Sequence, residues 1–309
     1  MVTRSKNSSA KRTGTSASTP ATGAAISTNG SGPSNRETLR KLYASLLRCR
    51  LIEEQLQRTS NPVRYEFVTG EEAVAIGAVA DLNAGDTLAA SPRDLAALLA
   101  GGAGVEEICD ANAEKSLLSK RSLLGILSLD GTATVSETPS FVSLVSLSED
   151  PFILGTGIAL AHKLARERHV VVAIAGQLSS LEPWREAFQM ALSQKLPIVY
   201  VMKNGGADQS VRAPHLKPVS FMAREGGFPG IVVDGQDVIA VRRVAQESVH
   251  RARNRGGPTL IDCRTEAGRD PLAYLKHYMR KRRVWDEKWS EMLVGQIGTE
   301  LRLKGAAPL

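Results

Sequence analysis

The chain has 309 residues, of which 42% are hydrophobic and 23% are charged, and its formal net charge is +7. Such a chain can bury a sizeable core, as one large α/β domain or two small ones. Residues 1–37 carry five basic residues and one acidic residue, so they contribute +4 and leave +3 for the rest. That near balance excludes a strong electrostatic footprint for nucleic acid. No apolar run is long enough to span a membrane, so we expect a soluble, cytoplasmic protein without nucleic-acid or membrane partners.

The three cysteines are Cys49, Cys109 and Cys263, which lie far apart in the sequence. They form no Cys-x-x-Cys pair and have no histidine nearby. This pattern favours buried thiols in a reducing compartment over zinc ligands or disulfides.

The first 36 residues are rich in Ser, Thr and Ala and have almost no large apolar side chains. They cannot offset the entropy of ordering, so we expect a disordered basic tail. The tail lacks the Leu/Arg periodicity of a transit helix. From residue 37 an apolar stripe at helical spacing begins, and Arg48, Arg50, Glu53 and Glu54 fall largely off that stripe. We predict an α/β domain over 37–269 and a helical extension of the same domain over 270–303.

The segment 69–77 predicts a capped helix start followed by small residues, and 87–90 predicts a short strand. Helices are expected over 95–100 and 105–113. Two apolar runs follow, at 123–129 and 141–147, and they are joined by serine-rich stretches. The small residues Gly155, Gly157 and Ala159 then indicate a helix that can pack closely on its neighbours.

The centre of the chain, residues 169–206, predicts one βαβ unit. Residues 170–175 and 198–202 are unbroken apolar runs, as expected for parallel strands buried on both faces. Between them, Trp184, Ala187 and Phe188 recur at helical spacing. Since ligands of parallel sheets bind at the carboxyl ends of strands, chemistry is expected after residues 175 and 203.

The remainder predicts a helix over 221–227, a strand over 231–233, a helix over 238–252 and a last strand after Pro258. One further helix is expected over 272–289. His215 lies in a polar loop and is expected to be solvent-exposed, and His277 is expected to be a partly exposed structural residue. The basic cluster 280–283 favours a solvated helix face or a partner contact.

Motifs in the central unit resemble the alpha subunit of the decarboxylase (dehydrogenase) component of 2-oxo acid dehydrogenase complexes, of the pyruvate and branched-chain type. The motifs are Glu186-Ala187, Lys195-Leu196-Pro197 and Asn204-Gly205, and further matches in order occur at 50–54, 69–77, 105–108, 233–237 and 256–261. The resemblance spans about residues 37–295. It implies the thiamin diphosphate-binding fold, a parallel α/β sheet with helices on both faces.

By this resemblance the cofactors are thiamin diphosphate and magnesium. The implied cofactor-binding residues are Arg93, Gly176, Gln177, Glu186 and Asn204, with Asn204 also a metal ligand. The family's metal-binding aspartate aligns with Gly176 or, after a slip of one residue, with Gln177. The family's Tyr and His around Arg93 are replaced by Pro92 and Leu95, and both essential histidines are missing, so we assign no catalytic residue.

Two functions are compatible with this pattern. In the first, the chain is an alpha subunit of a thiamin-dependent oxidoreductase that acts on the oxo group of 2-oxo acids with a lipoyl disulfide acceptor. Its partners would be a beta-type subunit and a lipoyl acyltransferase. In the second, the chain is a catalytically inactive relative with a structural or regulatory role beside a beta-type subunit. Because the metal-binding carboxylate is replaced, we predict that thiamin diphosphate binds poorly and that magnesium adds little.

Overall fold

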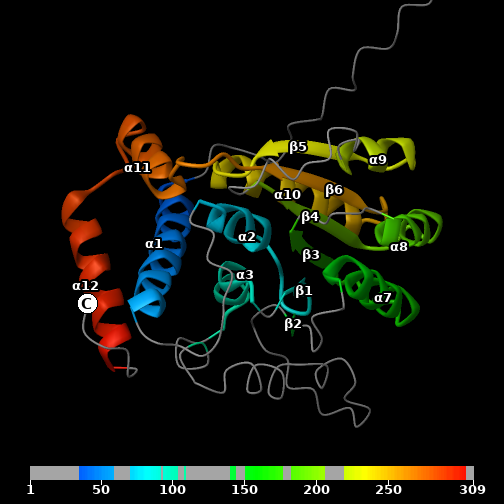
Figure 1. Cartoon of the computed structure of the whole chain (residues 1–309), viewed down its shortest axis with the longest axis horizontal. Coiled ribbons are helices and arrows are strands. Elements are labelled where there is room, and N and C mark those ends of the chain that lie inside the picture. Colours follow the sequence, from blue (N-terminus) through cyan, green and yellow to red (C-terminus); the bar gives the residue numbers. More distant parts are fainter. Residues whose placement is uncertain are drawn as a thin grey trace, which may run out of the picture. The chain divides into compact units, whose positions relative to one another are not determined.

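Six strands form one sheet in which all neighbouring strands run parallel (Figure 1). The structure is a computed structural model that describes residues 35–58, 70–91, 93–103, 108, 140–143, 150–176, 182–205 and 219–303. The strand order is β2-β1-β3-β4-β6-β5. The strands are β1 Thr87–Ala90, β2 Ser140–Ser143, β3 Val171–Gly176, β4 Ile198–Asn204, β5 Gly230–Asp234 and β6 Thr259–Arg264. The predicted parallel α/β fold is confirmed.

The predicted βαβ unit lies at the centre of the sheet, where β3 and β4 pair from Val171↔Ile198 to Gly176↔Lys203. Both strands are apolar and buried on both faces, which explains their unbroken hydrophobic sequence. The connecting helix ends at Ser193, Lys195 in the turn after it has a φ of +47°, and Leu196 is fully buried. The Lys195-Leu196-Pro197 motif therefore forms the turn from helix to strand.

Helices cover both faces of the sheet (Figure 1). One face carries α1 (Arg36–Arg58), α2 (Glu72–Val79), α3 (Leu95–Ala100) and α10 (Val238–Arg253). The other face carries α7 (Pro151–Leu164), α8 (Glu182–Ser193) and α9 (Val219–Glu225), with an aromatic core of Phe152, Trp184, Phe188, Tyr200 and Phe228.

Aspartates precede four of the described helices, which are α3, α7, α10 and the helix that begins at Pro271. Asp94, Asp150, Asp237 and Asp270 each accept a hydrogen bond from a backbone N–H in the first helical turn. Such caps satisfy donors that the helix itself leaves unpaired. By contrast, the predicted cap of α2 is wrong within the described residues, because Glu71 precedes this helix without a side-chain capping bond.

The single helix predicted over 272–289 is in fact two helices, α11 (Pro271–Lys281) and α12 (Glu287–Leu303). The chain turns at Arg283, whose φ is +57°, and the Val284 N–H bonds to the carbonyl of Met279. Trp285 then packs edge-on against Tyr43 of α1 at 4.9 Å between ring centroids. Burial of this indole against α1 explains why the helix breaks there.

The prediction for α1 is wrong at Glu53. The apolar stripe placed this residue on the polar face, but it is only 5% exposed. His277 is exposed, as is the basic cluster 280–283. Several predictions fall on residues that the structure does not describe. They concern the predicted tail 1–36 up to residue 34, the run 123–129, Cys109, Gln177 and His215. Of the predicted helix 105–113, only Ile108 is described, and it is helical. No helix within the described ranges is long and apolar enough to cross a membrane.

Candidate functional site

The carboxyl ends of the strands bring together residues that are far apart in the sequence. β3 ends at Gly176, β4 ends at Asn204 and β6 ends at Arg264, while Arg93 and Asp94 follow the end of β1. In an open parallel sheet this edge is where ligands bind. It is the first place to test the residues implied by the sequence.

Asn204 is buried, with 5% exposure, and its side chain is held by β6. Its amide Nδ2 donates to Asp262 Oδ1 at 2.7 Å. Asp262 is fully buried, and its other oxygen accepts from Ser220 Oγ at 3.3 Å. The carboxylate nearest to Asn204 is thus already engaged by an amide and a hydroxyl.

Gly176 pairs with Lys203 across the two central strands. Side chains alternate between the faces of a sheet, so a side chain at 176 would leave on the face of Lys203 and opposite to Asn204. A β-carbon added at Gly176 would meet no atom within 4 Å. Space is therefore available at 176, but it lies on the wrong face for a ligand that shares a metal with Asn204.

Gly205, directly after Asn204, is closed off by Thr265. A β-carbon at Gly205 would lie 1.5 Å from Thr265 Oγ1, so packing requires glycine here. The same hydroxyl donates to Glu71 Oε1 at 3.2 Å. The end of β4 is consequently filled by a hydrogen-bonded pair from β6 and α2.

The other implied residues are dispersed. Arg93 is partly buried, its backbone N–H bonds to Ser91 Oγ at 3.2 Å, and its guanidinium has no bond to another described residue. Glu186 is exposed on α8 and likewise has no hydrogen bond or ion pair within the described part of the chain. Gln177 lies outside that part. Of the five implied residues, Arg93, Gly176 and Asn204 lie at the strand ends, while Glu186 lies on the exposed face of a helix.

A charged cluster that the sequence did not predict lines a small cavity on the face covered by α1, α2 and α3. Its polar members are Cys49, Glu53, Glu71, Glu72, Asp94 and Lys203, and the cavity has room for about one water molecule. Lys203 Nζ lies 2.7 Å from Asp94 Oδ2, and both side chains are at most 10% exposed. The sequence could have indicated this pair, because Lys203 lies near the end of β4 and Asp94 follows β1, so both lie at the carboxyl edge of the sheet.

Arg50 extends the cluster from α1. It pairs with Glu72 and with Asp270 Oδ1 at 3.1 Å, and Glu72 Oε2 also accepts from the Gly70 N–H at 2.7 Å. Burial acts to lower the pKa of Arg50, but Glu72 and Asp270 together raise it. The motif at 70–72 thus has a structural role, because its glutamate joins α1 to the turn before α2.

Cys49 and Cys263 are buried free thiols, as predicted. Burial raises the pKa of both thiols, and neighbouring carboxylates raise it further. A protonated thiol is a poor nucleophile and a poor metal ligand. Neither cysteine therefore adds a reactive group to this edge.

The donor set that the described residues present at this edge does not fit a metal–diphosphate group. Magnesium prefers anionic and carbonyl oxygens in octahedral geometry. Asp94 is engaged by Lys203, Glu72 by Arg50, and Asp262 by Asn204 and Ser220. The geometry offers one partly buried guanidinium for an anion, and carboxylates whose charge is satisfied within the protein.

The parallel sheet with its covering helices makes this chain an α/β protein. In proteins of this class, ligands bind at the carboxyl edge of the sheet. Comparison with known proteins gives the family: the chain belongs to the dehydrogenase E1 component family, whose profile matches residues 48–266.

Several curated relatives are similar to this chain at low identity. The chain is 27% identical over 233 residues to the alpha subunit of acetoin:2,6-dichlorophenolindophenol oxidoreductase of Bacillus subtilis, covering 72% of this chain and 68% of that protein. It is 30% identical over 242 residues to the subunit of the same name in Cupriavidus necator, covering 75% and 71%. It is 27% identical over 285 residues to the chloroplastic pyruvate dehydrogenase E1 component subunit alpha-3 of Oryza sativa, covering 79% and 65%.

Proposed function

We propose that this chain is an alpha-type subunit of a thiamin diphosphate-dependent E1 component that oxidises 2-oxo acids in the cytoplasm with a lipoyl disulfide as acceptor. The family match over residues 48–266 carries this proposal. The names of the relatives, which are alpha subunits of pyruvate- and acetoin-oxidising proteins, support it. A beta-type subunit and a lipoyl acyltransferase are its partners.

In this proposal the chain alone holds the cofactor weakly, and the beta-type subunit supplies what is missing. The support is the state of the strand ends, where Thr265 and Glu71 fill the space after Asn204 and where Gly176 faces away from it. Arg93, whose guanidinium is partly buried at the end of β1, attracts a phosphate. No carboxylate of the charged cluster is available to a metal, because each has a partner within the protein.

The second candidate is a catalytically inactive family member that serves assembly or regulation. The closed strand end at Gly205 favours it, since any side chain there would overlap Thr265. In this case the fold is retained because α1, α2 and the ion-paired cluster form a rigid surface for another subunit.

Titration calorimetry with thiamin diphosphate, with and without magnesium, tests the proposal on the purified chain alone and with a beta-type partner. Reduction of 2,6-dichlorophenolindophenol in the presence of pyruvate or acetoin provides the activity readout. Turnover that requires both chains supports the alpha-type subunit. Complex formation without turnover, and without cofactor binding, establishes the inactive member. Magnesium-dependent micromolar binding by the chain alone would contradict the weak-site proposal.

A further inference from the structure

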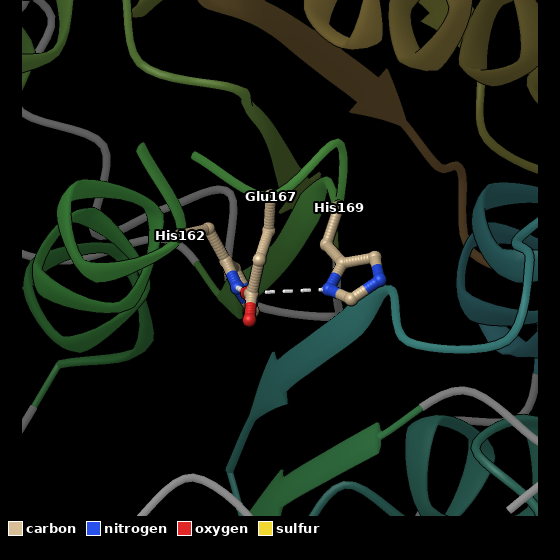
Figure 2. Close-up of side chains that lie close together, drawn as sticks. All are labelled: His162, Glu167 and His169. Carbon is tan, nitrogen blue, oxygen red and sulfur yellow. Dashed lines mark hydrogen bonds and ion pairs between the residues drawn. The ribbon is translucent and has the colours of Figure 1, made fainter. Parts of the chain in front are cut away.

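A second polar cluster lies at the amino ends of the strands, on the edge of the sheet opposite to Asn204. It consists of His162 near the end of α7, Glu167 in the following turn and His169 just before β3. Figure 2 shows the Glu167 carboxylate next to both imidazole rings. Glu167 Oε2 lies 2.5 Å from His162 Nδ1 and 3.3 Å from His169 Nδ1, and the three ligand atoms lie within 4.8 Å of one another.

The ring of His162 is oriented by a second contact, which its other nitrogen makes with β1. Its side chain is 11% exposed, and its Nε2 lies 3.1 Å from the hydroxyl of Thr87, the first residue of β1. A metal ion at Nδ1 would displace the proton that this nitrogen shares with Glu167 at 2.5 Å, and the ring would then carry its proton on Nε2, which donates to Thr87. Metal-bound histidines are typically held in this way, with the second ring nitrogen donating to an oxygen of the protein.

His169 is oriented by close packing on a turn. Gly85 has φ +86°, and a β-carbon there would lie 2.4 Å from His169 Nε2. The ring therefore rests on the glycine backbone, with its Nδ1 at 3.3 Å from Glu167 Oε2. The planes of the two imidazoles are 88° apart with centroids at 5.3 Å, so the rings do not stack face to face.

Two cations near this cluster, Arg253 and Lys163, have partners of their own. Arg253 is bound to the buried Asp86 and to the carbonyl of Arg168, and Lys163 Nζ is bound to Gln194. Asp86 also accepts from the Val170 N–H at 2.9 Å, which fixes the start of β3 beside His169.

We propose that His162, Glu167 and His169 bind one divalent transition-metal ion, with zinc as the best match. Two imidazole nitrogens and one carboxylate oxygen form a common three-ligand set for zinc, which leaves a fourth position for water. Tetrahedral zinc places its ligand atoms about 3.3 Å apart. The His169–Glu167 contact already has this length, whereas the His162–Glu167 contact must lengthen. Glu167 is 43% exposed and can move, and solvent reaches the site from its side.

This site is separate from the magnesium site implied by the family, in position and in chemistry. Nitrogen ligands suit zinc, copper and nickel, whereas magnesium prefers oxygen ligands. A bound ion would join the end of α7 to the start of β3 and, through Thr87, to β1. The proposal does not depend on the proposed function, because it concerns the opposite edge of the sheet.

Zinc binding by the full-length chain without an affinity tag, after treatment with a chelator, provides the test. Competition with a chromophoric chelator measures affinity, and cobalt absorption reports the ligand geometry. We expect one equivalent of zinc, tetrahedral cobalt bands, and magnesium that does not compete. Glu167→Gln and His169→Ala are each expected to weaken binding by about 10-fold or more.

The matched controls are His250→Ala and His277→Ala, which remove exposed histidines elsewhere and should leave the affinity unchanged. Circular dichroism of every variant verifies that it is folded. Absence of stoichiometric zinc binding by the unmodified chain would overturn the proposal. Binding that survives His169→Ala but is lost in a control variant would overturn it as well.

Discussion

The two edges of the sheet both concentrate charge, but they use it differently. At the carboxyl edge, Lys203–Asp94 and Arg50–Glu72 are buried pairs that neutralise each other. At the amino edge, Glu167 faces two imidazoles in a group that is open to solvent. Among the described residues, the charges at the carboxyl edge pair with each other and hold elements together, whereas the charge at the amino edge faces groups that are typical metal ligands.

Breaking the buried pair at the carboxyl edge should have the largest effect. Asp94→Ala removes the carboxylate 2.7 Å from the buried Lys203 ammonium, and it removes the cap of α3. We expect the free energy of unfolding to fall by about 3–5 kcal/mol, as measured by urea denaturation. Lys203→Met combined with Asp94→Asn should recover part of that loss. A loss in the double variant equal to the sum of the losses in Lys203→Met and Asp94→Asn would show that the pair is not coupled.

Two glycines at the ends of adjacent strands allow a matched test of the closed strand end. Gly205→Ala introduces a β-carbon against Thr265 and should destabilise the protein by about 1–3 kcal/mol. Gly176→Ala meets open space and should change stability by no more than about 0.5 kcal/mol. Thermal unfolding of both variants provides the comparison. A neutral Gly205→Ala would mean that the strand end is open.

Introducing an aspartate at residue 176 or 177 tests whether the replaced carboxylate limits cofactor binding. Gly176→Asp places its carboxylate on the face of Lys203, so we expect magnesium to change thiamin diphosphate affinity no more than before. Gln177→Asp tests the alternative alignment, in which the family's aspartate falls on residue 177, and there it should introduce a magnesium dependence of about 10-fold or more in calorimetry. The reverse result would show that Gly176 corresponds to the lost ligand.

The buried thiols predict a smaller, pH-dependent effect. Burial raises the pKa of Cys49 and Cys263 in the folded chain, so folding favours the protonated thiols. Their stabilising contribution is complete below about pH 8.5 and is lost as the pH rises above that value. Peptide mapping after iodoacetamide treatment at pH 8 should find both residues unmodified. Modification of Cys49 in the folded protein would mean that the cavity beside it is accessible.

The sequence predicted the elements whose signal is local. The apolar runs of β3 and β4 identify a doubly covered strand pair, and each pairs as expected. The break between α11 and α12 was missed because it depends on Trp285 packing against Tyr43, more than 200 positions away. Buried Glu53 was missed for the same reason, since the helical pattern cannot show which partners a polar residue will meet.

For the candidate sites, too, the local signals were recognised and the contacts between distant positions were not. Asn204 was found because it ends a recognisable strand, but its bond to Asp262 links positions 58 residues apart. Lys203 and Asp94 were missed because the pair forms only when β1 and β4 are brought to one sheet. The sequence His162-x4-Glu167-x-His169 is local, and the end of a helix beside a strand start could have indicated it.

The strand order also determines how the backbone amides exchange with solvent. β3 and β4 each have neighbours on both sides, whereas β2 and β5 form the edges of the sheet. Edge strands exchange through small local openings, but the central pair must lose both neighbours before its amides are exposed. The amides of Val172 and Val199 should therefore be among the last to exchange deuterium. Their rates would report the global unfolding equilibrium of the sheet, independently of any ligand at either edge.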